Sequence, residues 1–242
     1  MLLIRAADGL HRQDPDQRRV HLRREQSTKR NRRLAPREEA ALLAVAGDRL
    51  QRLIIAALES GCRLGELLKL QTRDLDLARR EMTIRTENAK DGEQRVLPIS
   101  NRLAAVLEMA TLDLAGQPLP PDGFVFGDGT GQRVKSPKRA WATCVLKAHG
   151  CEPQWTTGGK LAPASCAELR RIDLRFHDLR HEAGSRLIEG GWPGHRVQEI
   201  LGHASLTQTS TYLNITREGL HESMRKIDEA RTVAHPLQTR AK

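Results

Sequence analysis

Aromatic residues and long apolar runs are both scarce in this 242-residue chain. Phenylalanine, tryptophan and tyrosine make up 3% of the sequence, and Tyr212 is the only tyrosine. So few rings argue against a platform on which single-stranded bases stack. The longest aliphatic run, Leu53 to Leu58, is too short to cross a bilayer, and Arg5 interrupts the N-terminal apolar stretch before a signal-peptide core develops. We therefore expect a soluble intracellular protein.

Cysteine is sparse as well and shows no metal-binding or disulfide pattern. The four cysteines form no CxxC pair and no zinc-like spacing with histidine: Cys62, Cys144, Cys151 and Cys166. His149 precedes Cys151 by two residues, but one such pair falls far short of the four ligands of a structural zinc site. We expect reduced thiols, no metal and no cofactor.

Basic residues are abundant, and they are concentrated at the N-terminus. Lysine and arginine give the chain a net charge of +10 and an isoelectric point near 10.0. Residues 1–33 contain ten of these basic residues against four acids. This balance favours a polyanionic partner, duplex nucleic acid first, because protein cations bind its phosphates. The alternative is a solvated basic surface without a partner.

A compact domain is predicted to begin at Leu34. Pro36 suits the first position of a helix and two glutamates follow it, which predicts a first helix. A second helix is predicted over Arg49–Ser60, and Gly61 ends it before a short helix in LGELLKL. Arg63 therefore lies at the elbow between two buried helices.

The middle of the chain carries the signal of a β-hairpin. The segment EMTIRTENAKDGEQRVLPI alternates apolar and polar residues on both sides of Asp91 and Gly92, which predicts a hairpin with Lys90 at its tip. Further expectations are helices at 100–112 and 137–148, a short strand at 123–126, and an irregular segment at 150–173 that is rich in proline and glycine.

Helical patterns resume after Phe176. Four short helices are predicted, at 177–190, 194–201, 206–214 and 217–231. The whole pattern predicts an α+β fold that is mainly α-helical, with a small antiparallel sheet or hairpin.

Six residues suited to phosphate chemistry occur in a fixed order. They are Arg63 in SGCRLGELLKL, Lys90 in the hairpin, His177 and Arg180 in FHDLRH, His203 in LGH, and Tyr212. Each motif alone arises often by chance. The order and the spacing, with Lys90 eight residues before Pro98 and His203 nine before Tyr212, make the set specific.

This set resembles the tyrosine recombinases, or phage-type integrases, and specifically their C-terminal catalytic domain. The resemblance covers Leu34 to Ile215, about three quarters of the chain. It implies the DNA breaking-rejoining fold, double-stranded DNA as the partner, and strand exchange without ATP or metal. One departure is SGCR in the first motif, where TGxR is commoner in the family.

The resemblance assigns both arginines to the scissile phosphate. A guanidinium can donate two parallel hydrogen bonds to two non-bridging oxygens, a geometry that lysine does not offer. Arg63 and Arg180 would therefore stabilise the transition state. The alternatives are ion pairs, of Arg63 with Glu66 and of Arg180 with Asp178 or Glu182. Glu66 is interpreted as a buried acid that steadies Arg63 rather than as a catalytic group.

By the same resemblance, Tyr212 attacks phosphorus and forms a 3′-phosphotyrosyl bond, while Lys90 protonates the leaving 5′-hydroxyl. His177 assists proton transfer at Tyr212, and His203 hydrogen-bonds the phosphate. The alternatives are a solvated turn lysine and structural roles for the tyrosine and histidines. A structural role is also the interpretation for two histidines that match no family position, His181 and His195.

The predicted domains are a basic arm or linker at 1–33, a catalytic domain at 34–231 and a flexible tail at 232–242. Family members usually carry a helical core-binding domain before the catalytic domain. In this sequence, the residues before Leu34 leave room only for the basic arm. The resemblance further predicts a homotetramer on DNA, docking through 217–231, and a cytoplasmic, nucleoid-associated location. Two other functions remain open: type IB topoisomerase-like nicking and closing, and a non-catalytic DNA-binding or regulatory protein.

Overall fold

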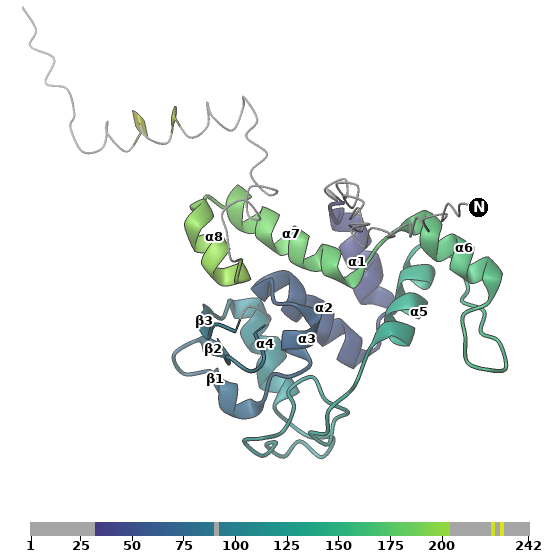
Figure 1. Ribbon diagram of the computed structural model, residues 1–242, viewed down its shortest axis with the longest axis horizontal. Helices are drawn as coiled ribbons and strands as arrows, with labels where there is room; N and C mark the ends of the chain where they lie inside the picture. Colours follow the sequence, from purple (N-terminus) through teal and green to yellow (C-terminus); the bar gives the residue numbers. More distant parts are fainter. Residues whose placement is uncertain (1–31, 90–91, 204–223, 226–227, 230–242) are drawn as a thin grey trace, which may run out of the picture. The chain divides into compact units, whose positions relative to one another are not determined.

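The computed structural model describes residues 32–89, 92–203, 224–225 and 228–229. In these ranges the chain is mainly helical with one three-stranded antiparallel sheet, which confirms the predicted fold class (Figure 1). The helices are α1 (Pro36–Val45), α2 (Asp48–Ser60), α3 (Leu64–Leu67), α4 (Asn101–Ala110), α5 (Lys138–Ala148), α6 (Pro163–Ile172), α7 (Phe176–Glu189) and α8 (Gly194–Leu201), with a 3₁₀ turn at Thr72–Asp74. None of the helices described is long and apolar enough to pass through a membrane.

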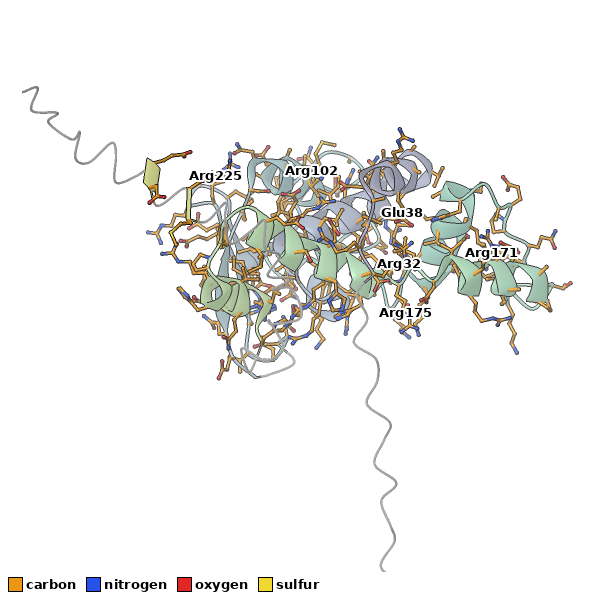
Figure 2. The ribbon with its side chains drawn as sticks, turned by 90° about the horizontal axis from the view of Figure 1, so that it is seen from above. Arg32, Glu38, Arg102, Arg171, Arg175 and Arg225 are labelled. Carbon is orange, nitrogen blue, oxygen red and sulfur yellow. The ribbon has the colours of Figure 1, made fainter. Side chains whose placement is uncertain are left out.

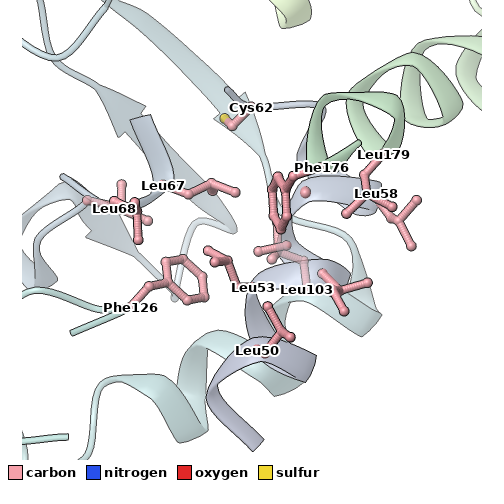
Figure 3. Packing of buried hydrophobic residues seen from close by; sticks show 14 of the residues in the cluster. Leu50, Leu53, Leu58, Cys62, Leu67, Leu68, Leu103, Phe126, Phe176 and Leu179 are labelled. Carbon is pink, nitrogen blue, oxygen red and sulfur yellow. The ribbon is translucent and has the colours of Figure 1, made fainter. Parts of the chain in front are cut away.

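Helix α2 carries the centre of the hydrophobic core. Its apolar residues recur every three or four positions, so Leu50, Leu53 and Leu58 are all buried along it (Figure 3). The helix packs against α4 on one side and α7 on the other (Figure 1). Burying one leucine stabilises the fold by roughly 1.5–3 kcal/mol. Gly61 ends α2 in the left-handed region, with φ at 64°, as the sequence predicts.

The sheet has the strand order β1, β2, β3, with β1 at Leu75–Asp76, β2 at Glu81–Ile84 and β3 at Arg95–Pro98. In the pairing of β2 with β3, Met82 lies opposite Leu97, and both are buried. The predicted hairpin strands are confirmed, but the connection is longer than a tight turn at Asp91 and Gly92. It spans residues 85–94, because Asn88 and Ala89 N–H groups bond back to the Arg85 carbonyl before β3 begins. Strand β1 was not predicted.

Two sequence-based expectations are wrong. Residues 123–126 form no strand; only an isolated bridge joins Phe124 to Gln71, because the chain turns at Gly123 and again at Gly127. The segment 150–173, expected to be irregular, contains helix α6. Pro163 was interpreted as a breaker, but it occupies the start of α6, where its missing N–H costs nothing.

Helices α7 and α8 begin and end within one residue of the predicted 177–190 and 194–201. Helix α8 lies beside β3 (Figure 1). The predicted helix 206–214 lies outside the described residues. Of the predicted helix 217–231, the structure describes four residues, and all four are helical.

Residues 32–34 lead into α1 and contact α7. Arg33 donates from Nε to the buried Glu182 at 2.7 Å, and the Leu34 N–H donates to the same carboxylate at 3.0 Å. Arg186, one turn further along α7, also donates to Glu182 at 2.9 Å. The entry to the folded domain is therefore fixed to the helix that contains His177 and Arg180. The rest of the predicted basic arm, 1–31, lies outside the described residues.

Candidate functional site

Arg63 lies between α2 and α3, at the predicted elbow. Its backbone N–H donates to Glu66 Oε2 at 2.8 Å, so Glu66 caps the start of α3. Its side chain donates from Nη1 to Glu66 Oε1 at 3.1 Å and from Nη2 to the Gly202 carbonyl at 3.0 Å. The ion pair with Glu66 proposed as an alternative is therefore present, and it also connects Arg63 to the end of α8.

Arg180 is buried in α7 and bonds to the ends of two other helices. It donates from Nη1 to the Gly61 carbonyl at 2.9 Å and from Nη2 to the Leu201 carbonyl at 2.5 Å. These carbonyls lie at the C-terminal ends of α2 and α8, where the helix dipole is negative. The fold thus orients this guanidinium with peptide dipoles.

Glu66 lies between two guanidiniums and is 2% exposed. Besides Arg63, it accepts a bond from Arg95 Nη2 at 2.6 Å, while Arg95 Nε donates to the Ile200 carbonyl at 3.1 Å. Burial alone would raise the pKa of Glu66, but the hydrogen bond and charge of Arg95, with the Arg63 N–H, hold it below its ordinary 4.5.

Sequence reasoning missed Arg95. The strand alternation contained part of its signal, because Arg95 and Leu97 share one face of β3, and Leu97 is buried. An arginine on an apolar face requires a partner inside the protein. The side chain of Arg95 is only 8% exposed, and that partner is Glu66.

His177 lies in the first turn of α7, three residues before Arg180. Its ring contacts His181 edge to face, with 4.9 Å between centroids. The residue is exposed overall, although its ring is partly buried. That partial burial, followed by the positive charges of His181, Arg180 and Arg63, lowers the pKa of His177 from 6.5 to about 4. The imidazole is therefore neutral at neutral pH and can accept a proton.

His203 follows the C-terminal residue of α8 by two positions. Its backbone N–H donates to the Gln198 carbonyl at 3.1 Å, and its own carbonyl accepts from the Gln198 side chain at 3.0 Å. These two bonds fix the backbone of His203 next to Gly202, whose carbonyl receives Arg63. The end of α8 therefore brings together Arg63, Arg180 and His203.

Two of the six predicted site residues, Lys90 and Tyr212, lie outside the described residues. Cys62 is the thiol next to Arg63 (Figure 3). Burial, and then the negative charge of Glu66, raises the pKa of Cys62 to about 11, so it stays a neutral thiol and a poor nucleophile.

Positive charge gathers at the described site. Arg63 and Arg95 both donate to Glu66, and the positive charge of Arg180 also acts on that carboxylate. Such a site favours an anion that gains negative charge in a transition state. Within the described ranges, no group of three or more histidine, cysteine, aspartate or glutamate side chains is arranged to hold a metal ion.

Comparison with curated proteins finds recombinases. The chain is 27% identical over 179 residues to tyrosine recombinase XerA of Pyrococcus furiosus, covering 74% of this chain and 54% of that protein. It is 32% identical over 176 residues to tyrosine recombinase XerC of Azotobacter vinelandii, covering 71% of this chain and 51% of that protein. The chain spans about half the length of the curated relatives it matches.

Solved structures show the same fold. The crystal structure of XerA recombinase matches with a TM-score of 0.57 at 21% identity, covering 81% of this chain and 64% of that one. The catalytic domain of bacteriophage HP1 integrase matches with a TM-score of 0.52 at 19% identity, covering 87% of this chain and 98% of that one. The model of the phage integrase family matches residues 32–218. Because that match covers well over half of the chain, the protein belongs to the phage integrase family of tyrosine recombinases.

Proposed function

We propose that this protein is a site-specific DNA recombinase or integrase that cleaves and rejoins duplex DNA through a 3′-phosphotyrosyl intermediate at Tyr212. The observation that carries the proposal is the convergence of Arg63, Arg180 and His203 at the C-terminal end of α8. These are three of the six active-site residues that the family resemblance names, and the resemblance assigns all three to the scissile phosphate.

In the proposed reaction the two guanidiniums act on the phosphate. As Tyr212 attacks, negative charge grows on the non-bridging oxygens, and Arg63 and Arg180 stabilise it. Both arginines are held in place by carbonyls at helix ends, so little reorganisation is needed when the charge develops. His203 donates a further hydrogen bond to the phosphate.

Proton transfers complete the reaction. The phenol of Tyr212 must lose a proton as it attacks, and we assign its acceptance to His177, whose ring is neutral at neutral pH. The leaving 5′-hydroxyl must gain a proton, which Lys90 supplies. The phosphotyrosyl bond conserves the energy of the broken phosphodiester, so a 5′-hydroxyl can attack it and rejoin a strand without ATP.

Double-stranded DNA is the proposed partner, and the net charge of +10 supports it. Among structures of related fold, the Tn1549 transposon integrase was solved in complex with circular intermediate DNA. We also propose a homotetramer on DNA, with 217–231 docking onto a neighbouring protomer, and a nucleoid-associated location. The proposed domains remain a basic arm at 1–33, a catalytic domain at 34–231 and a tail at 232–242.

Plasmid relaxation tests the chemistry without knowledge of the recombination site. The purified chain is incubated with supercoiled plasmid in EDTA without ATP, alongside the Tyr212→Phe variant, which lacks only the phenolic oxygen. The wild type should relax the plasmid and become attached to DNA in a form that survives detergent. The variant should do neither, while binding DNA as tightly as the wild type.

The other outcomes point to different functions. Relaxation by both proteins would show that Tyr212 is not the nucleophile. Binding without relaxation or covalent attachment by the wild type would favour a non-catalytic DNA-binding or regulatory protein. Relaxation without recombinant products from paired sites would restrict the activity to topoisomerase-like nicking and closing.

A further inference from the structure

Arg95 connects three segments that meet at the proposed site. It extends from β3, donates to Glu66 on α3 and donates to the Ile200 carbonyl at the end of α8. Gly202 approaches its guanidinium so closely that a Cβ placed there would lie 2.9 Å from Nη1. The side chain of Arg95 is 8% exposed, and its Nε and Nη2 are both bonded within the protein.

The position of Arg95 decides how the charge of Glu66 is shared. Glu66 Oε2 accepts from Arg95 and from the Arg63 N–H, whereas Oε1 accepts from the Arg63 side chain. If Arg95 were absent, the whole carboxylate charge would act on Arg63. Arg63 would then be neutralised by its own helix cap and would attract a phosphate less strongly.

Arg95 also fixes the end of α8 from outside that helix. The Ile200 carbonyl belongs to the last turn, whose carbonyls have no partner within the helix. The next carbonyl, of Leu201, receives Arg180, and the one after it, of Gly202, receives Arg63. Three successive carbonyls are therefore bonded to three arginines, so a shift of one changes the position of the others.

We propose that Arg95 is a positioning residue for strand transfer: it holds Glu66 and the end of α8 so that Arg63 and His203 meet the scissile phosphate. This inference rests on the proposed function. Arg95 acts through the groups it orients and does not touch the DNA. Arginine suits this position because two separate nitrogens of its planar guanidinium donate, Nε to Ile200 and Nη2 to Glu66, whereas lysine would have to reach both acceptors from a single nitrogen.

The test compares Arg95→Met and Arg95→Lys with a matched control, Arg171→Met. Arg171 lies on α6, is 68% exposed and pairs only with Glu168 among the ion pairs described (Figure 2). Helices α6 and α8 lie at opposite ends of the view in Figure 1. The control therefore removes the same charge and shape far from the site.

Each full-length protein is assayed for the relaxation rate at saturating enzyme and for affinity to a random duplex. For Arg95→Met we expect the rate to fall between about tenfold and a hundredfold, the size expected when a catalytic group is misplaced by about an ångström. DNA affinity should stay within twofold, because Arg95 makes no phosphate contact. Arg95→Lys should recover part of the rate, and Arg171→Met should match the wild type.

A second measurement does not depend on activity. Hydrogen exchange of the amides at 201–203 should be faster in Arg95→Met than in the wild type, while the amides of α5 are unchanged. If the wild type relaxes no plasmid, the proposed function fails, and the exchange result then tests only whether Arg95 holds the end of α8. Unchanged exchange at 201–203, or an Arg95→Met relaxation rate within twofold of wild type, would overturn it. A loss of DNA affinity parallel to the loss of rate would also overturn it, by indicating general unfolding.

Discussion

Replacing Gly202 with alanine should disturb the arginines at the end of α8. Gly202 has φ at +60°, a conformation that side chains with a Cβ disfavour. An added Cβ would lie 2.9 Å from Arg95 Nη1 and 3.1 Å from its Cζ. The guanidinium cannot move aside freely, because bonds to Glu66 and to the Ile200 carbonyl hold it.

Two effects should lower the free energy of unfolding of Gly202→Ala. Holding alanine in the left-handed region costs about 1–2 kcal/mol. Displacing Arg95 breaks at least one hydrogen bond that involves a charged group, which adds about 1.5–3 kcal/mol. The free energy of unfolding, measured by urea denaturation, should therefore fall by about 2.5–5 kcal/mol. Plasmid relaxation should slow at a temperature where the variant remains folded.

Gly191→Ala separates the two effects. Gly191 has φ at +85°, and a Cβ built there would meet no atom within 4 Å. This variant therefore carries backbone strain alone and should lose about 1–2 kcal/mol with an unchanged relaxation rate. Equal destabilisation by the two substitutions would refute the reasoning, since it would mean that Gly202 is not constrained by Arg95.

Three further predictions concern titration and ion pairs. The pKa of His177, followed by NMR and assigned with His177→Gln, should lie near 4, and a value near 6.5 would contradict the crowded, positively charged surroundings. Glu182→Gln should lower the free energy of unfolding by about 1–3 kcal/mol, because it weakens the bonds of a buried carboxylate to two partly exposed arginines, Arg33 and Arg186. Glu168→Gln, on the exposed surface, should change it by less than about 1 kcal/mol. Burial would raise the pKa of Glu66 and of Glu182, yet their arginine partners hold both pKa values below 4.5. The two carboxylates therefore contribute their full stabilisation above pH 4.5 and lose it as the pH falls through their pKa values in the folded protein. The urea midpoint should accordingly drop below pH 4.5, and by less in Glu182→Gln; an equal drop in both proteins would count against this assignment.

Helix positions were predictable where apolar spacing and caps agree. Leu50, Leu53 and Leu58 follow the helical repeat, and Gly61 supplies the left-handed cap, so α2 was predicted to within one residue. Helix α6 was not predicted, because Pro163 was interpreted as a breaker although it occupies the start of the helix. The contact of α6 with α5 adds tertiary packing that stabilises this helix.

The site was predictable only in part for a related reason. Arg63, Arg180 and His203 were found from motif order, which reports residue identity and spacing. Arg95 belongs to no such motif, and its importance depends on contacts with α3 and α8, which lie far from it in the sequence. The strand alternation indicates that Arg95 needs a partner inside the protein, but spacing along the chain does not identify Glu66 as that partner.

The way in which the arginines are held explains how the site can be both rigid and strongly positive. A carboxylate partner fixes a guanidinium but cancels its charge, whereas a peptide carbonyl fixes it with a dipole and leaves the charge in place. Arg180 is bonded to two carbonyls, and Arg63 and Arg95 each to one carbonyl and to the shared Glu66. One carboxylate thus orients two guanidiniums, and the helix ends supply the remaining bonds. In the proposed reaction, a guanidinium bonded to carbonyls keeps positive charge with which to stabilise an anionic transition state.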